Sequence, residues 1–239
     1  MDRIKRYERR FTLIELLTVV ALISMLMAVG VPAFARMIRG SKVDESARNI
    51  KLALEQAQMR AAAERCYVAV IFPNGNNTDV PDKLRHYRLG GFRTAYVRKN
   101  GDSYEFARWV EGSDWSNAPD GAALVRVNTS NFSPTNGYVT GCSSSVTKLM
   151  GGSDLKKVIG VVSGIVDDQG NDKKIDNFAI IFNPYGGIEG GAKLYLLVSE
   201  ALIDGTSVIY PTAQSPGDNS TANYRVLKVN NLTGRVEFE

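Results

Sequence analysis

Few residues of this chain combine a reactive type with a spacing that supports catalysis. The single histidine, His86, lies in the segment 84–87 (Leu-Arg-His-Tyr), and no serine has the Gly-x-Ser-x-Gly surroundings of a hydrolase nucleophile. His-Glu-x-x-His, Cys-x-x-Cys and Walker A patterns are absent, so neither a zinc site nor ATP binding is indicated. We interpret His86 as a residue on a strand surface and predict a protein that is not an enzyme, with no metal and no cofactor.

An acid-rich segment, Asp167–Asp176, could supply oxygen ligands to calcium through its Asp and Asn side chains. Its spacing does not fit an EF-hand loop, and Lys173 and Lys174 interrupt the acids. We therefore interpret it as a solvated hairpin turn, with calcium binding as the alternative.

The two cysteines, Cys66 and Cys142, are too few for a disulfide scaffold or a zinc cluster. Outside the cytoplasm they could form one disulfide. The alternative is two separate buried thiols, and sequence spacing does not decide between the two because it does not show that the residues meet.

The N-terminal region has the charge pattern of a membrane anchor. Residues 1–10 carry five basic and two acidic residues, so most of the chain's net charge of +4 lies there. Residues 11–35 contain one ionisable residue, Glu15, and the uncharged run from Leu16 to Ala35 spans about 30 Å as a helix, which is the thickness of a bilayer core. Basic residues on the N-terminal side favour an N-terminus inside the cell and a large domain outside. A removable signal peptide is the less favoured alternative, because this apolar run is long and continues into a second helical pattern.

Glu15 is the unusual residue of this segment, because a carboxylate near an apolar helix is costly and is a functional candidate by default. It could extend to the lipid headgroups. Alternatively, it could pair with a positive group of a neighbouring subunit, such as the free amine of a processed N-terminus.

The residues 11–17 (Phe-Thr-Leu-Ile-Glu-Leu-Leu) resemble the start of mature type IV pilins and type II secretion pseudopilins. The resemblance implies that a prepilin peptidase cleaves between Arg10 and Phe11, that Phe11 is then N-methylated, and that Glu15 sets the register between subunits. Pro32 lies where members of the family carry a proline that loosens the helix, and a proline removes one helical hydrogen bond. The family has Gly before the cleavage point, whereas this chain has Arg10. Without cleavage, the protein would be an unprocessed, membrane-anchored extracytoplasmic protein.

The segment 36–65 is predicted to be an amphipathic helix that continues the first, so that one long helix runs from about Phe11 to Glu64. Its apolar stripe recurs at spacings of three and four residues: Val43, Ala47, Ile50, Leu54, Ala57 and Ala61. We expect this stripe to pack on a sheet of the same subunit. A coiled coil is the alternative, but the stripe covers fewer than three heptads and half of it is alanine.

Residues 66–239 are predicted to form a β-rich globular domain, in which 73–177 is an elaborated or inserted region. Runs of β-branched and aromatic residues separated by turn residues predict these strands: 66–72, 83–89, 94–98, 104–110, 122–127, 157–162, 178–182, 193–199 and 224–229. No helical pattern separates them, so the sheets should be mostly antiparallel. The predicted fold class is α+β: a long N-terminal helix, half transmembrane and half amphipathic, packed on antiparallel sheet.

The C-terminal part resembles GspH/FimT-like minor pseudopilins. It carries Phe-Asn-Pro-Tyr-Gly at 182–186, two strands, and Leu-Thr-Gly-Arg-Val at 232–236. The resemblance implies a minor pilin or pseudopilin of a type II secretion pseudopilus or a type IV pilus. Its partners would be other pilins and the peptidase, and it would lie in the inner membrane or in the filament.

DNA binding, as in FimT-like pilins of transformable bacteria, is the alternative function. It would use Arg225, Lys228 and Arg235. The acidic end of the chain, Glu237 and Glu239, would repel phosphate and makes nucleic acid a less favoured partner.

Overall fold

The computed structural model describes residues 12–73, 91–119, 121–132, 150–151, 156–166, 172–204, 207–209 and 223–239. The chain divides into two compact units, Met1–Ile38 and Arg39–Glu239, and each is described by itself. His86, Cys142, the predicted strand 83–89 and residues 1–11 lie outside the described residues.

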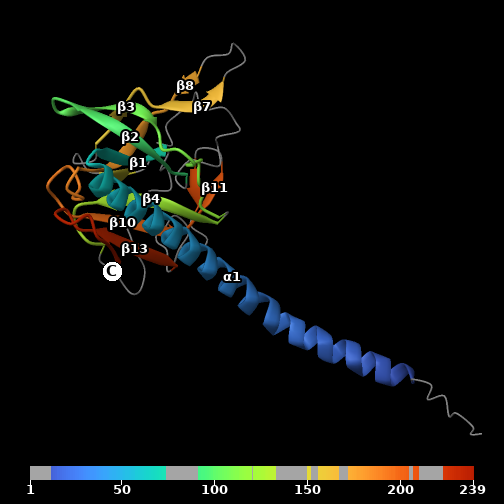
Figure 1. The fold of residues 1–239 in the computed structure, drawn as a ribbon. Coiled ribbons are helices and arrows are strands. Elements are labelled where there is room, and N and C mark those ends of the chain that lie inside the picture. The colour runs from blue at the N-terminus through green and yellow to red at the C-terminus, as the bar shows by residue number, and fades with distance from the viewer. Residues whose placement is uncertain are drawn as a thin grey trace, which may run out of the picture. The chain divides into compact units, whose positions relative to one another are not determined.

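One helix, α1, runs from Leu13 to Glu64 and continues through Pro32 (Figure 1). The prediction of one long helix ending at Glu64 is confirmed. The helix ends because Arg65 adopts a left-handed backbone with a φ of 51°. The backbone N–H of Cys66 then donates to the carbonyl of Ala61 at 3.2 Å, as in a Schellman cap.

The part of α1 in the first unit is apolar around its whole circumference. Its segment Leu13–Val31 has a mean hydropathy of 2.4, and none of it is buried within the molecule. By length and composition this segment is able to cross a membrane.

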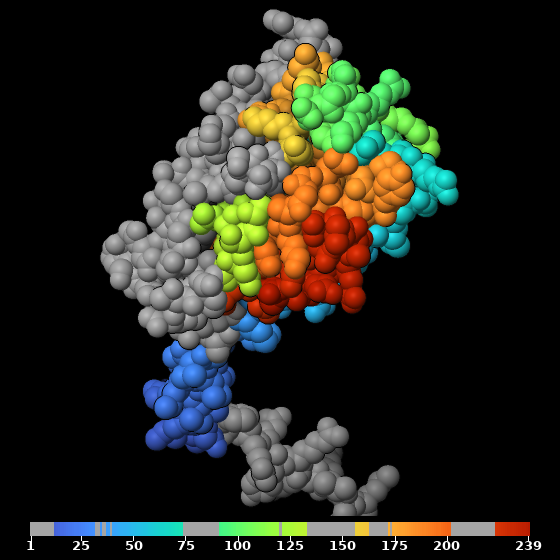
Figure 2. All heavy atoms as spheres, turned by 90° about the vertical axis from the view of Figure 1, so that its left-hand side faces the viewer, coloured from blue at the N-terminus to red at the C-terminus, as the bar shows by residue number. Residues whose placement is uncertain are grey.

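The second unit contains two five-stranded sheets among its described residues. The first has the order β6 (Val158–Ile159), β3 (Ser103–Trp109), β2 (Arg93–Asn100), β1 (Tyr67–Pro73), β9 (Asn177–Phe182). The second has the order β14 (Val236–Phe238), β13 (Tyr224–Val229), β10 (Leu194–Glu200), β4 (Ala122–Asn128), β5 (Met150–Gly151). In Figure 2, β4, β10 and β13 are the yellow-green, orange and red bands that lie side by side.

Neighbouring strands are antiparallel except for two short pairings, β3 with β6 and β4 with β5, which are parallel. Two small hairpins complete the described strands: β7 (Val162–Val166) with β8 (Asp172–Lys174), and β11 (Leu202–Asp204) with β12 (Ser207–Ile209). The predicted α+β class with mostly antiparallel sheets is confirmed.

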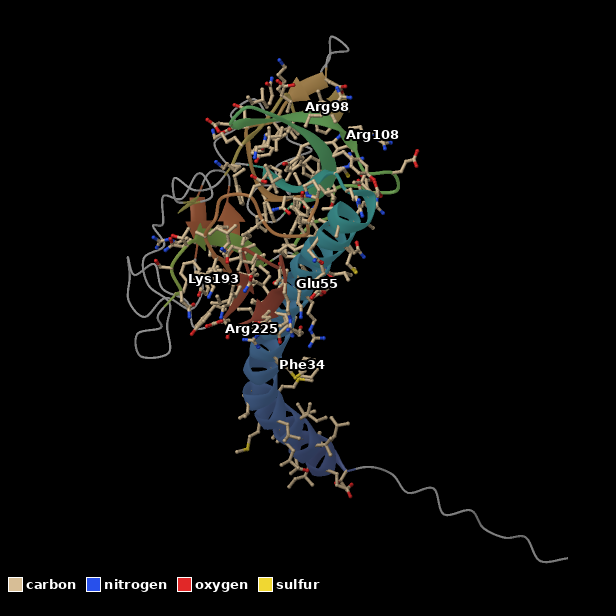
Figure 3. All side chains as sticks on the ribbon, turned by 60° about the vertical axis from the view of Figure 1, so that its left-hand side comes forward. Phe34, Glu55, Arg98, Arg108, Lys193 and Arg225 are labelled. Atoms are coloured by element: carbon tan, nitrogen blue, oxygen red, sulfur yellow. The ribbon has the colours of Figure 1, made fainter. Side chains whose placement is uncertain are left out.

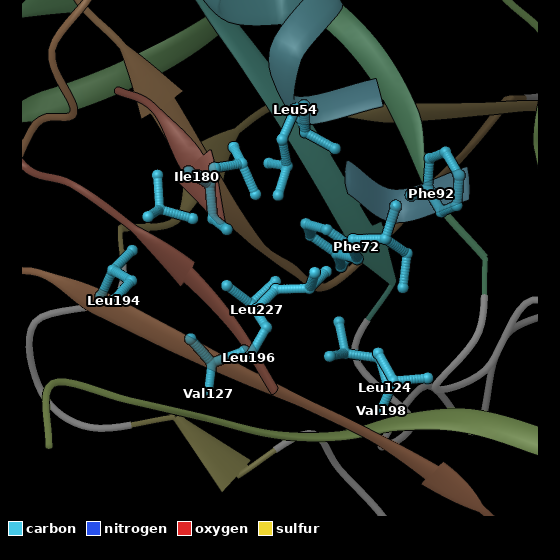
Figure 4. Close-up of a cluster of buried hydrophobic side chains, with 14 of the residues drawn as sticks. Leu54, Phe72, Phe92, Leu124, Val127, Ile180, Leu194, Leu196, Val198 and Leu227 are labelled. Carbon is cyan, nitrogen blue, oxygen red and sulfur yellow. The ribbon is translucent and has the colours of Figure 1, made fainter. Parts of the chain in front are cut away.

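The main core lies between α1 and the two sheets. All six residues of the predicted stripe on α1 are at most 2% exposed, and they belong to one cluster with side chains of both sheets. In Figure 4, Leu54 of the helix, Ile180 of β9 and Leu227 of β13 surround the same apolar volume. The stripe therefore packs on the protein's own sheets, and the coiled-coil alternative is wrong.

The first sheet is buried on both faces. A second apolar cluster, which includes Ile71, Ala95 and Ile181, lies on the face opposite to the main core. Every residue of β9 is buried, which explains why its sequence is a continuous apolar run rather than an alternating one.

Part of the sequence prediction for 73–177 needs correction. The strand predicted over 157–162 is two strands, β6 and β7, because Gly160 turns the chain with a φ of 78°. At the acid-rich segment, Asp172–Lys174 is strand β8 paired with β7, whereas 167–171 lies outside the described residues. Strands β2, β3 and β4 are integral members of the two sheets, and whether the whole region is an insertion stays a prediction.

Candidate functional site

The start of α1 holds the residue with the strongest functional signal, Glu15. Its Oε2 accepts hydrogen bonds from the backbone N–H of Thr12 at 2.8 Å and from the Thr12 hydroxyl at 2.9 Å. The backbone N–H of Glu15 donates in return to the Thr12 hydroxyl oxygen at 3.3 Å. These reciprocal contacts form a capping box, which satisfies backbone donors that a helix N-terminus leaves free.

The capping box gives Glu15 partners within its own chain. The carboxylate is fixed next to the helix N-terminus, where the helix dipole favours negative charge. Its oxygens remain exposed and are available to a positive group brought by another molecule. Sequence reasoning singled out Glu15 but missed Thr12, although Thr followed three residues later by Glu is the sequence signature of a capping box.

The other residues of the predicted assembly site are less well defined. Arg10 and Phe11 lie outside the described residues. Pro32 lies within the continuous helix. Cleavage between Arg10 and Phe11, and a loosening role for Pro32, stay predictions.

The apolar part of α1 carries a groove beside Gly30. Ile23, Met27 and Phe34 lie along it, and a side chain added at Gly30 would meet no atom within 4 Å. Phe34 projects from the helix in Figure 3. A groove at a glycine allows close approach of another helix or of lipid chains.

The three cations proposed for DNA binding each contact a carboxylate. Arg225 Nε lies 2.6 Å from Asp44 Oδ1, Lys228 Nζ lies 3.1 Å from Glu239 Oε2, and Arg235 Nε lies 3.0 Å from Glu237 Oε1. The hydrogen bond to Glu239 also raises the pKa of Lys228.

The same cations do not share one face. Arg225 (Figure 3) and Lys228 are three residues apart on β13, so they point to opposite faces of the sheet. The structure does not gather them into the continuous basic surface that phosphate binding requires.

Cys66 is half-buried directly after the helix cap, and burial raises the pKa of its thiol. Because Cys142 lies outside the described residues, the disulfide stays a prediction. Within the described part of the chain, no group of three or more His, Cys, Asp or Glu residues could hold a metal ion.

Comparison with known proteins gives one likeness of fold. No family model and no curated protein matches the chain. A solved structure of the type IV minor pilin FimU from Pseudomonas aeruginosa is similar over 83% of this chain and 89% of that one, with a TM-score of 0.40 and 10% identity. At this TM-score and identity the likeness is too distant to indicate a function.

Proposed function

We propose that this protein is a minor pilin or pseudopilin, a structural subunit of a type II secretion pseudopilus or a type IV pilus. Its N-terminal helix would anchor it in the inner membrane before assembly and would pack with the helices of other subunits afterwards. The β domain would then lie outside the cytoplasm. Nothing in this role requires a catalytic residue or a cofactor.

The continuity of α1 carries the proposal. One helix of 52 residues is apolar and unburied over Leu13–Val31 and packed into the domain core from Val43 onwards. The apolar segment has no partner in the described chain, so lipid or other helices must cover it. A helix that joins the span to the core without an intervening loop makes the domain move with its anchor, as a filament subunit requires.

Glu15 distinguishes an assembling subunit from a simple anchor. An anchor alone gains nothing from a carboxylate at the start of its span. The capping box holds that carboxylate in one place, which suits a contact that must recur identically from subunit to subunit. The resemblance of residues 11–17 to the pilin start supports the same role.

A DNA-binding role has less support. Arg225, Lys228 and Arg235 are each ion-paired, and two of them are on opposite faces of β13. Competition from their own carboxylates weakens any contact with phosphate.

N-terminal mass spectrometry of the native protein tests the processing step. A mature chain that begins with N-methylated Phe11 supports the proposal. An intact Met1 in the membrane would instead favour the unprocessed anchored protein. Arg10→Gly, which restores the family residue, should then increase cleavage.

Substitution of Glu15 tests assembly separately. Glu15→Ala should abolish recovery of the protein in sheared filaments while the β domain stays folded. Ser24→Ala is a matched control, because Ser24 lies in the same span and its hydroxyl only bonds the carbonyl of Val20. Filaments that form normally with Glu15→Ala would contradict the assembly role.

A further inference from the structure

Two turns of the domain hold large apolar side chains out into solvent. Tyr185 is 93% exposed and Leu232 is 80% exposed. They lie in the turns Asn183–Gly187, after β9, and Asn230–Gly234, after β13, which we call the paired turns. Single exposed apolar residues are ordinary on protein surfaces, so their arrangement has to distinguish them.

Both turns are fixed by the same device. The carboxamide oxygen of Asn183 accepts from the backbone N–H groups of Tyr185 and Gly187, at 3.0 and 3.1 Å. The carboxamide oxygen of Asn230 accepts from those of Leu232 and Thr233, at 3.0 and 3.1 Å. In each turn the exposed apolar residue is the second after the asparagine, with its backbone held in place.

The paired turns also lock against each other and against α1. The backbone N–H of Ile188 donates to the carbonyl of Asn231 at 2.9 Å, and Gln58 Nε2 donates to the carbonyl of Thr233 at 3.1 Å. A Cβ at Gly234 would clash with the carbonyl of Gly186, so the two backbones are in close contact. The exposed side chains therefore extend from a rigid base, and little backbone entropy is lost when they bind.

A cleft of about 550 Å³ lies elsewhere on the same unit, between α1 and the turn after β3. Met59, Ala63 and Val110 give it apolar walls, and Arg60, Glu64 and Ser113 give it a polar edge. Its volume is within the range of about 300–1,000 Å³ typical of ligand pockets. An aromatic ring with a terminal hydroxyl matches such walls, because it can lie on Met59 and hydrogen-bond at the edge.

The paired turns and the cleft lie on opposite flanks of α1. Residues of a helix are about 100° apart around its axis. Gln58, which contacts the paired turns, is therefore on one side of the buried stripe, and Arg60 and Glu64 of the cleft are on the other. No charged residue occurs in either paired turn, so nothing there repels the mixed charges of the cleft.

We propose that the paired turns of one molecule insert Tyr185, with Leu232 beside it, into the cleft of a second copy of this chain. The two surfaces differ, so the contact is heterologous and repeats from copy to copy instead of closing on itself as a twofold pair does. This inference rests on the proposed function and names the lateral contact between neighbouring domains.

Photo-cross-linking of the full-length chain in its membrane tests the contact. Tyr185→p-benzoylphenylalanine should give a cross-linked dimer in which the tryptic peptides 52–60 or 61–65 of the second copy are attached. The same photoreactive residue at Ile159, which is 57% exposed on β6, is the matched control and should give no such product. Attachment only at other peptides, attachment only to another protein, or no dimer would overturn the proposal.

The direction of the contact gives a second test with two tagged copies. Ala63→Arg, which fills the cleft, should lower the cross-link about tenfold or more when it is in the copy without the photoreactive residue, as expected for loss of a central aromatic contact. The same substitution in the photoreactive copy should leave the cross-link to an unmodified partner intact. Equal effects from both copies would overturn the heterologous arrangement.

The outcome is separable from that of the proposed function. In a Glu15→Ala background the anchored chains still meet in the membrane, so the cross-link should persist although filaments are lost. Loss of the cross-link with normal filaments would overturn the lateral contact and leave the filament role standing.

Discussion

The two parts of α1 use their apolar side chains in opposite ways. In the first unit, large residues such as Leu22, which is 62% exposed, have no partner within the described chain. In the second unit, the stripe that includes Ile50 and Leu54 is almost fully buried by both sheets. One unbroken helix thus has one part that needs an outside partner and one part that the protein covers itself.

The difference follows from the distribution of apolar residues around the helix. Residues 16–35 carry no charge on any side, so no single sheet could cover them. Beyond Ile38, charged residues such as Lys51 and Glu55 alternate with the stripe and lie 3.6 Å apart in an ion pair on its polar side. Only that second pattern specifies one face for burial.

The largest expected effect comes from removing a buried residue of the second part. Leu54→Ala should lower the free energy of unfolding by about 2–5 kcal/mol, because Leu54 is 0% exposed and its loss leaves a cavity. Leu52→Ala, two residues away and 53% exposed, should change it by less than about 0.5 kcal/mol. Denaturant unfolding of the full chain in detergent measures both, and equal effects would contradict the one-sided burial.

A charge in the first part should act on the membrane instead of on the domain. Leu22→Arg should cost about 2.5–3.5 kcal/mol of insertion free energy, since Leu22 lies within the candidate span. The expected result is a larger fraction of protein extracted by alkaline carbonate, with unchanged unfolding of the domain. Leu22→Ala is the control, and a domain that unfolds more easily with Leu22→Arg would mean that this part is packed after all.

Glycines sharpen the same contrast. Gly234→Ala should lower stability by about 2–3 kcal/mol, because Gly234 has a φ of 67° and its Cβ would meet the carbonyl of Gly186. Gly30→Ala should leave the thermal unfolding midpoint of the domain unchanged, because open space surrounds Gly30. A drop in the midpoint with Gly30→Ala would show that something packs there.

The smallest effect is a pH dependence confined to the second unit. Burial, followed by its hydrogen bond to Glu189, raises the pKa of Tyr104 from 10 to about 12. The unfolded chain therefore loses this proton at a lower pH than the folded chain, and stability should fall as the pH rises from 10 to 12. Lys99, whose pKa is raised by the same carboxylate, acts in the same direction.

Denaturant unfolding at pH 9 and pH 11 measures this effect. Tyr104→Phe should lose less stability between the two values than the unaltered protein does. A slope that is unchanged by Tyr104→Phe would assign the pH dependence to other groups.

Most of the fold could be predicted because its signals are local. The stripe at 43–61 has a helical period, and the runs at 67–73 and 178–182 are apolar enough to be strands wherever they pack. The short strands β5, β11, β12 and β14 were not predicted, since two or three residues carry no periodic signal and gain their structure from a neighbour. Gly160 broke the predicted strand 157–162 because glycine readily adopts a positive φ.

The sequence by itself determined that the N-terminal segment can span a membrane, that the helix continues into a domain, and that Glu15 stands out. These are properties of composition and of one helical period, and they do not depend on distant residues. The tertiary structure decided what the polar groups do. It joins Asp44 to Arg225 and brings the paired turns, almost 50 residues apart in the chain, into contact at Gly186 and Gly234. Those contacts depend on strand order and register, which long-range packing sets.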